Sequence, residues 1–304
     1  MDYGEIIGTA FKVAWRNKTL WILGLFAAGL SNLSDSFQFP FKSHMDIDKF
    51  QILGYTIDFG RFAESNMWIL AAIAGLLVIY FLIFLILHCI CTPALIDAVN
   101  RLTRGGVYRL RDSFSAGLDF FWRYIGINIL VIMIGLVVGA ALIGPPVLCF
   151  IINPILGFLS LLIFIPVFFI FILTISTIST LAERAMVIRN INITDALTEG
   201  MDLFWKNKIN SLIIFLLYIA LAIGLALGLI VVFGLISIPF VLIASTSTIG
   251  LIMALAIGLP ILMIIMLPVS GFLGAAFEAM DTIFYFRLVE PQGALSTPVQ
   301  STHQ

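Results

Sequence analysis

The chain has 304 residues, of which 61% are hydrophobic and 11% are charged, and its formal net charge is −1. Soluble domains carry about 25% charged residues. A soluble fold of this length could not cover its apolar surface, so the composition excludes one and indicates a chain that uses lipid as its solvent. We expect no nucleic-acid partner. The three cysteines, Cys89, Cys91 and Cys149, fall in apolar runs and form no spaced disulfide framework.

Three short segments along the chain share one pattern. Each contains a tryptophan followed directly by a base: Trp15-Arg16, Trp122-Arg123 and Trp205-Lys206. An acid lies ten residues before each tryptophan, and a small residue lies five before it. The acids are Glu5, Asp112 and Asp195, and the small residues are Ala10, Gly117 and Gly200. Self-similarity of this kind indicates a repeat architecture.

The spacing within these segments predicts amphipathic helices. In the second copy the apolar positions Phe114, Leu118, Phe121, Trp122 and Ile125 fall on one helical face. Polar residues, including Asp119 and Arg123, line the other face, where they are explained by dipole interactions and i,i+4 pairs without any substrate. We expect these helices to lie at the membrane interface, with each tryptophan and its base anchored at the lipid headgroups.

Six apolar runs predict six transmembrane helices, near 19–35, 67–96, 125–144, 155–181, 209–235 and 250–277. The first run is short, and the charge distribution decides whether it crosses. With six spans and both termini in the cytoplasm, 13 of the 16 Lys and Arg residues lie inside, and only Lys42, Lys49 and Arg61 lie outside. The positive-inside rule favours this arrangement.

The predicted fold class is therefore all-α: a polytopic membrane protein with six transmembrane helices in three repeats of an interfacial helix and a transmembrane hairpin. One membrane domain spans 1–290, with repeats at about 3–100, 110–190 and 193–288, and a flexible polar tail at 291–304. The loop 36–66 is the one sizeable external segment, whereas the outer turns 143–154 and 237–248 are tight or partly dipped into the membrane. Glycine pairs at 135/139 and 224/228 suit close packing inside the bundle, or dimerisation.

Few side chains in the sequence are of the kinds that form catalytic, metal-binding or cofactor-binding sites. The apolar runs hold no lysine, arginine, aspartate or glutamate at bilayer depth, which argues against an ion-coupled transporter. No hydrolase, metalloprotease or phosphate-loop motif is present, so we expect no catalytic or metal site, no cofactor and no enzymatic activity. His88 is the one candidate for binding a cofactor such as haem; its alternative role is a hydrogen bond within the bundle. The cluster Arg101, Arg104, Arg109 and Arg111 predicts binding of anionic headgroups, an ordinary topology signal, or both.

Two segments near the chain ends carry a family resemblance. The stretches AWRNKTLWILGLFAAGL at 14–30 and AFEAMDTIFYFRL at 276–288 resemble a broad group of prokaryotic multi-pass proteins. That group is similar to the membrane domain attached to some glycerophosphodiester phosphodiesterases. The resemblance implies a six-helix domain in a prokaryotic cytoplasmic membrane, and it carries no catalytic residue to this chain.

Two functions stay open at this stage. The first is a non-enzymatic integral membrane protein, a scaffold or accessory subunit that packs against other membrane proteins or lipids. The alternative is a passive carrier of lipid or another small molecule. A buried polar cavity at the bilayer midplane would favour the carrier, and a solid, glycine-packed core would favour the scaffold.

Overall fold

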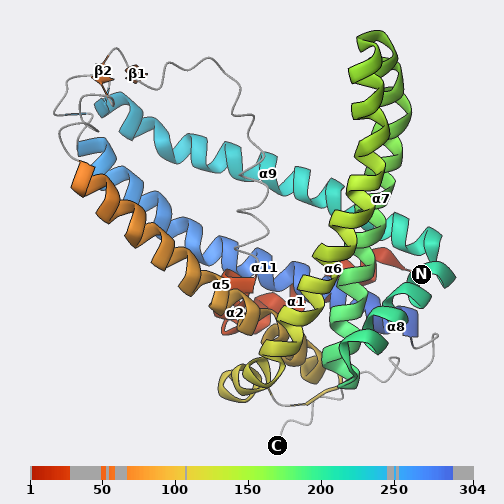
Figure 1. Cartoon of the computed structure of the whole chain (residues 1–304). Helices are drawn as coiled ribbons and strands as arrows, with labels where there is room; N and C mark the ends of the chain where they lie inside the picture. The colour runs from red at the N-terminus through yellow and green to blue at the C-terminus, as the bar shows by residue number, and fades with distance from the viewer. Residues whose placement is uncertain are drawn as a thin grey trace, which may run out of the picture.

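The computed structural model describes residues 2–27, 49–52, 55–58, 67–106, 108–244, 250 and 253–289, which are helical apart from one β-hairpin (Figure 1). The elements are α1 (Tyr3–Arg16), α2 (Leu20–Ala27), β1 (Lys49–Ile52), β2 (Tyr55–Asp58), α5 (Met67–Thr103), α6 (Leu110–Ile152), α7 (Pro154–Arg189), α8 (Ile193–Lys206), α9 (Lys208–Ala244), η1 (Ala254–Gly258, a π-helical turn) and α11 (Leu259–Val289). The antiparallel pair β1–β2 was not predicted. The tail 291–304, residues 28–35 of the first predicted span and most of the loop 36–66 lie outside the described residues.

Five helices are long and apolar enough to cross a membrane. They are α5, α6, α7, α9 and the segment Ala256–Val289, which combines most of η1 with α11, and they have 34 to 43 residues each. A helix rises about 1.5 Å per residue, so each exceeds the roughly 30 Å hydrocarbon core of a bilayer. Each helix therefore continues beyond the predicted apolar run at one or both ends.

The junction between interfacial helix and span differs among the three copies. α1 and α8 are followed directly by Asn17 and Asn207. In Asn17 the backbone N–H and the side-chain N–H both donate to the Val13 carbonyl, and in Asn207 both donate to the Leu203 carbonyl. Asparagine competes in this way with helix continuation. In the second copy Tyr124 takes the equivalent place, and α6 runs unbroken from Leu110 to Ile152. The separate interfacial helix expected there is thus the first part of one long helix.

The outer turn between α6 and α7 is tight. α6 continues through Pro145 and Pro146 to Ile152, so the predicted turn 143–154 reduces to Asn153. The Asn153 side chain accepts a hydrogen bond from the Ile155 N–H at 2.9 Å, and Pro154 fills the first helical position, where no amide hydrogen is required. The other predicted turn, 237–248, is helical up to Ala244, and 245–248 lie outside the described residues.

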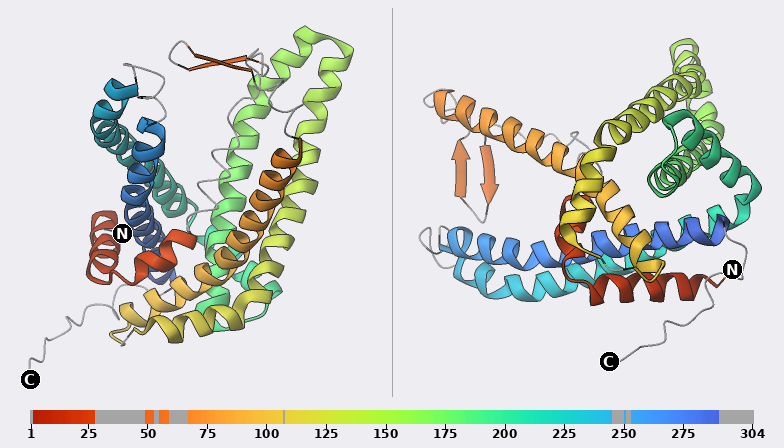
Figure 2. Two further views of the ribbon diagram at one scale, coloured as in Figure 1. Left: turned by 90° about the vertical axis from the view of Figure 1, so that its left-hand side faces the viewer. Right: turned by 90° about the horizontal axis from the view of Figure 1, so that it is seen from below.

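The helices share a base and diverge from it. Seen from below, α5, the α6–α7 hairpin and the pair formed by α9 and α11 extend in different directions (Figure 2). The buried core lies at the base, where one end each of α5, α7 and α11 meets α1, α2 and the start of α6, and it includes residues from Ala94 to Val99, Leu181 to Val187 and Ala275 to Phe286. By contrast, no more than 12% of the most apolar 18 residues of any spanning helix is buried.

Small residues bring the helices of the base into close contact. A Cβ atom added at Gly117 would lie 2.3 Å from the Ile90 carbonyl oxygen of α5, and one at Gly200 would lie 2.8 Å from the Ile178 carbonyl oxygen of α7. Ala10, at the same distance before its tryptophan, is fully buried in α1, which packs against α11. The small residue of the sequence pattern is therefore the contact point of each interfacial helix with a span.

The buried faces of α1 and α8 carry mainly small residues. α1 buries Ile6, Ala10 and Ala14, and α8 buries Ala196, Gly200 and Phe204. The predicted apolar face of the second copy is divided: Phe114, Phe121 and Ile125 are partly buried against the core, whereas Leu118 and Trp122 are 50% and 78% exposed. Leu118 and Trp122 consequently remain free to face lipid.

Candidate functional site

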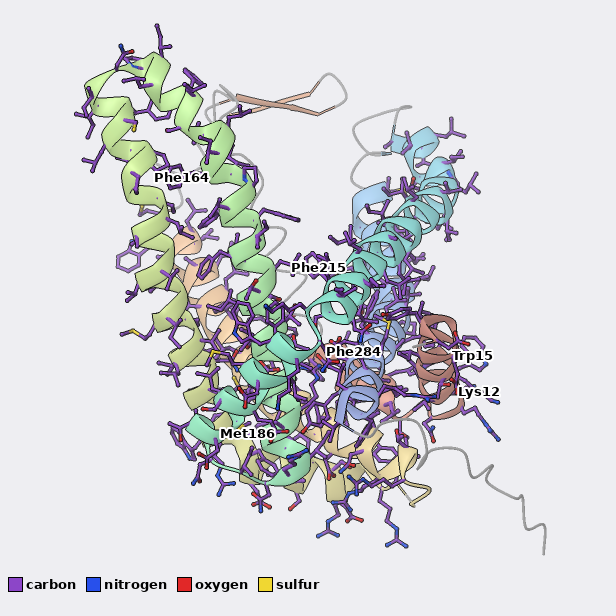
Figure 3. All side chains as sticks on the ribbon, turned by 90° about the vertical axis from the view of Figure 1, so that its right-hand side faces the viewer. Lys12, Trp15, Phe164, Met186, Phe215 and Phe284 are labelled. Carbon is purple, nitrogen blue, oxygen red and sulfur yellow. The ribbon has the colours of Figure 1, made fainter. Side chains whose placement is uncertain are left out.

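The three predicted tryptophan–base pairs all lie on the surface. Trp15, Trp122 and Trp205 are 63%, 78% and 54% exposed, and Arg16, Arg123 and Lys206 are also exposed. Trp15 and Lys12 project outward from α1, away from the base that contains Met186 and Phe284 (Figure 3). The three pairs are therefore accessible from outside the protein core.

The bases beside the tryptophans have different partners. Arg123 donates to the Asn190 side chain at 2.7 Å and so ties α6 to the end of α7, where Asn190 adopts the left-handed conformation that asparagine tolerates. At the third pair it is Lys208, rather than the neighbouring Lys206, that lies over the Trp205 ring, 4.3 Å from its centroid. Lys206 instead borders a polar cavity of about 550 Å³ between α8 and the ends of α7 and α11.

The predicted arginine cluster is split by the structure. Arg101 pairs with Asp97 at 2.8 Å, and Arg104 donates to Asn100 and lies 5.5 Å from the ring centroid of Phe286. Arg109 and Arg111, at the start of α6, are exposed. Two of the four arginines are thus engaged within the chain, and two are available to a headgroup.

His88 lies within the bundle. Its Nδ1 is 3.1 Å from the Phe26 carbonyl oxygen of α2, and its ring centroid is 6.2 Å from that of Tyr124. The neighbouring Cys89 and Cys91 are buried. The contact with α2 is the kind that a structural histidine makes, and within the described residues no group of three His, Cys, Asp or Glu side chains has an arrangement that could hold a metal ion.

A charged cluster that the sequence analysis did not predict lies where α7 meets α11. The guanidinium of Arg184, 2% exposed, contacts three carboxylates: Glu183 at 3.2 Å, Asp281 at 3.3 Å and Glu278. It also donates to the Thr180 carbonyl oxygen at 3.1 Å. Two of these acids come from α11, so the arginine fastens the ends of two different hairpins at the base.

Other polar side chains complete this Arg184 cluster. Tyr218 of α9 donates to Asp281 at 3.4 Å and stacks on Phe277 with ring centroids 4.7 Å apart, and Ser179 donates to Glu183 at 3.3 Å. The Arg184 Nε has no hydrogen-bond partner. Buried charges are costly unless they are paired, and inside a membrane protein they commonly mark a functional position.

The sequence held a weak signal for this cluster. Glu183-Arg184 follows directly after an apolar run and is flanked by the small residues Ala182 and Ala185, and two acids three residues apart end the last span. Charges are expected at the ends of transmembrane helices, so these residues did not stand out as a cluster. In the structure the Arg184 side chain is 2% exposed and contacts acids of α7 and α11, which its place among the predicted cytoplasmic charges did not indicate.

Comparisons with known proteins add no relative: no family model, no curated protein and no solved structure matches this chain. The resemblance to the membrane domain of the phosphodiesterases therefore stays a prediction. Function has to be inferred from the arrangement of the helices, the exposed anchors and the Arg184 cluster.

Proposed function

We propose that the protein is a non-enzymatic scaffold or accessory subunit of a prokaryotic cytoplasmic membrane. Its six spans form three units, each made of an interfacial helix and a transmembrane hairpin, with both termini in the cytoplasm. The inner ends of the spans hold the chain together, and the outer arms present apolar surface to lipid and to other membrane proteins.

The observation that carries this proposal is the uneven burial of apolar surface. The core occupies the inner ends, whereas at most 12% of the most apolar stretch of each spanning helix is buried by the rest of the chain. Helices whose most apolar stretches are so little buried by the rest of the chain have to be covered by lipid or by other proteins. The cavity between the outer halves of α6 and α7, about 350 Å³, is lined by apolar side chains such as Phe150, Phe164 and Phe168.

The contacts between units support the three-unit organisation. The start of α6 packs on α5, α8 packs on α7, and α1 packs on α11, so each interfacial helix rests on the returning span of the unit before it. The third contact returns to the first unit and closes the ring. α2 follows directly after α1 and starts the short first span, whose residues 28–35 lie outside the described part of the chain.

Labelling of introduced cysteines tests the six-span topology. In a background without the native cysteines, Ser43→Cys and Gly60→Cys should react with an impermeant maleimide applied outside the cell. Gly106→Cys, an exposed position after α5, should react only after permeabilisation. The reverse pattern would overturn this topology.

The two glycine pairs indicate where a partner helix could pack. A Cβ at Gly135 would touch Ile175 at 3.5 Å and one at Gly139 would touch Phe168 at 3.9 Å, so that pair is occupied by α7. A Cβ at Gly224 or Gly228 of α9 would meet no atom within 4 Å. Small residues let helix backbones approach closely in lipid, so this open face of α9 suits another transmembrane helix.

Photocrosslinking in intact membranes tests the scaffold proposal. A photoreactive amino acid at Val231, on the glycine face of α9 and 61% exposed, should give discrete protein adducts. The same label at Ala226, on the opposite face, should give mainly lipid adducts. The protein adducts should disappear when Gly228 is changed to leucine, and identical lipid adducts at both positions would contradict the proposal. Purification in mild detergent, with identification of copurifying proteins and lipids, names the partner.

The Arg184 cluster is the observation that favours the alternative, a passive carrier, because buried charges at span ends can border a transport path. Reconstituted vesicles with an internal pH-sensitive dye test one form of this alternative. Proton flux that depends on Asp281 would favour the carrier over the scaffold. If the protein is a scaffold, we expect vesicles that contain the wild-type protein to show no proton flux beyond that of protein-free vesicles.

A further inference from the structure

The Arg184 cluster holds more acids than bases. Glu183, Glu278 and Asp281 all contact the single guanidinium, so one positive charge faces up to three negative charges, an excess of two. Two of the acids, Glu278 and Asp281, contact the same Nη2 atom. They lie three residues apart on α11 and therefore on the same face of that helix.

No second cation offsets this excess among the described residues. The titratable groups that face the cluster from the other packed helices are Tyr218 of α9, Tyr124 of α6 and Cys89 of α5, and none of them is a base. Arg184 is 2% exposed, and the three acids retain 11% to 19% exposure. The cluster is thus shielded from bulk water but still reachable by protons.

Burial of two excess negative charges is unfavourable, and carboxyl groups in such a position take up protons or bind a cation. A metal ion does not suit this position, because the described residues include no group of three acid, histidine or cysteine side chains with metal-binding geometry. Two carboxylates that contact the same nitrogen atom lie close enough to disfavour each other's ionisation, so such a group of acids binds a proton more readily than an isolated acid does.

We infer that the Arg184 cluster is a proton-binding site: at neutral pH the acids around the guanidinium together hold one proton. This proton reduces the repulsion among the acids and lets them stay against Arg184, which joins α11 to α7. The site is independent of the proposed scaffold role, so its failure would leave that proposal untouched.

The proton links pH to stability in a defined direction. In the unfolded chain the acids are ionised at neutral pH, so the folded state binds more protons than the unfolded state. The free energy of unfolding should therefore fall as pH rises through the range in which the proton leaves the folded protein. In acid, where the proton remains bound, this contribution is fully present.

Infrared difference spectroscopy of the whole protein in lipid nanodiscs tests the site. The spectrum between neutral and alkaline pH should contain the carbonyl stretch of a buried protonated carboxyl group. This band should be lost or shifted in Glu278→Gln and in Asp281→Asn. The control is Glu5→Gln, which removes an acid that is 55% exposed and paired with Arg287 at 2.8 Å, and its spectrum should keep the band.

A second measurement covers the case in which a variant folds poorly. The melting temperature of the wild-type protein should fall between neutral and alkaline pH, and Glu278→Gln should flatten this dependence because the amide stays neutral. Absence of the carboxyl band from the wild-type spectrum, or its survival in both variants, would overturn the proposal. Sodium-dependent stabilisation at alkaline pH without the band would also overturn it and assign a cation to the site instead.

Discussion

The α6–α7 hairpin and the pair formed by α9 and α11 come from equivalent parts of the predicted repeat, yet they pack differently. α6 and α7 are joined at Asn153 and touch along their length, from Phe150 and Phe158 at the outer end to Gly135 and Ile175 further in. α9 meets η1 and α11 near its two ends, through Phe240 beside Gly258 and through Tyr218 stacked on Phe277. The glycines of α9 between these contacts are open.

This difference shows that a pair of glycines does not specify its own partner. The pair on α6 is filled because α7 presents large side chains, Phe168 and Ile175, at the matching height. The pair on α9 has the same spacing but no such counterpart within the chain. A small-residue motif permits close approach, and the opposing surface decides whether the approach occurs.

The largest expected effect on stability comes from removing the Arg184 ion pairs that connect α7 to α11. Arg184→Met leaves three carboxylates without their cation, and breaking a buried ion pair costs about 3–5 kcal/mol. We expect a loss of this size in denaturant unfolding measured in nanodiscs, with labels on α7 and α9 reporting separate transitions. Arg189→Met is the control, because its pair with Glu199 is 46% exposed on the arginine side and should contribute no more than about 1 kcal/mol. Equal decreases in the free energy of unfolding of the two variants would contradict the proposed role of Arg184 in connecting α7 to α11.

The next effect concerns the contact of α8 with α7. Gly200→Val places a side chain against the backbone of Ile178 and Ala182, where a Cβ would lie 2.8 Å from the nearest atom. Overpacking of this kind costs about 1–3 kcal/mol, measured as a lower free energy of unfolding. Gly8→Val in α1 is the matched control, because a Cβ there meets no atom within 4 Å. If the control were destabilised as much, helix propensity rather than packing would explain both results.

A third pair of variants tests the comparison of the hairpins directly. Gly139→Leu should lower the free energy of unfolding by about 1–3 kcal/mol, because its side chain enters the contact with α7. Gly228→Leu should change it by less than about 0.5 kcal/mol in the purified protein. Both changes alter helix propensity equally, so the difference between them measures packing. A large decrease in the free energy of unfolding for Gly228→Leu would show that the glycine face of α9 packs against the rest of the chain.

The smallest effects belong to the three tryptophan–base pairs. Replacement of Trp15-Arg16, Trp122-Arg123 or Trp205-Lys206 by Ala-Ala should each lower stability in anionic membranes by about 1 kcal/mol, since a base near an anionic surface contributes roughly that amount. The three losses should be similar and should shrink in neutral lipid. The check is thermal melting of the three double variants in vesicles of both compositions. Effects confined to one copy, without a change in stability, would rule out anchoring.

Much of the helical framework was predictable. Long apolar runs such as 67–96 and 155–181 identified spanning helices, because in lipid the backbone has to satisfy its own hydrogen bonds. The Asp2 side chain caps α1 by accepting a hydrogen bond from the Glu5 N–H at 3.2 Å, a role that aspartate favours just before a helix. The six-span count and the repeat remain predictions, since part of the first span lies outside the described residues.

The candidate sites were predictable only in part. The exposed tryptophans were identified from their spacing, but the hydrogen bond between Arg123 and Asn190 joins residues 67 positions apart and left no mark in the sequence. The break after α1 and α8, and its absence in α6, follow from Asn17, Asn207 and Tyr124. The identity of the residue two positions after each tryptophan thus distinguishes a broken helix from a continuous one.

The sequence by itself determined that this chain is helical and suited to a membrane, because hydropathy and periodicity are local properties of consecutive residues. It also marked the small residues, such as Gly117 and Gly200, at which helices approach closely. Only the tertiary structure decided that Arg184 points into the base and gathers acids from α7 and α11, and that the glycines of α9 stay open while those of α6 are filled. The reason is physical: the rotation of each helix about its axis, and the surface that it meets, depend on packing against segments far away in the chain.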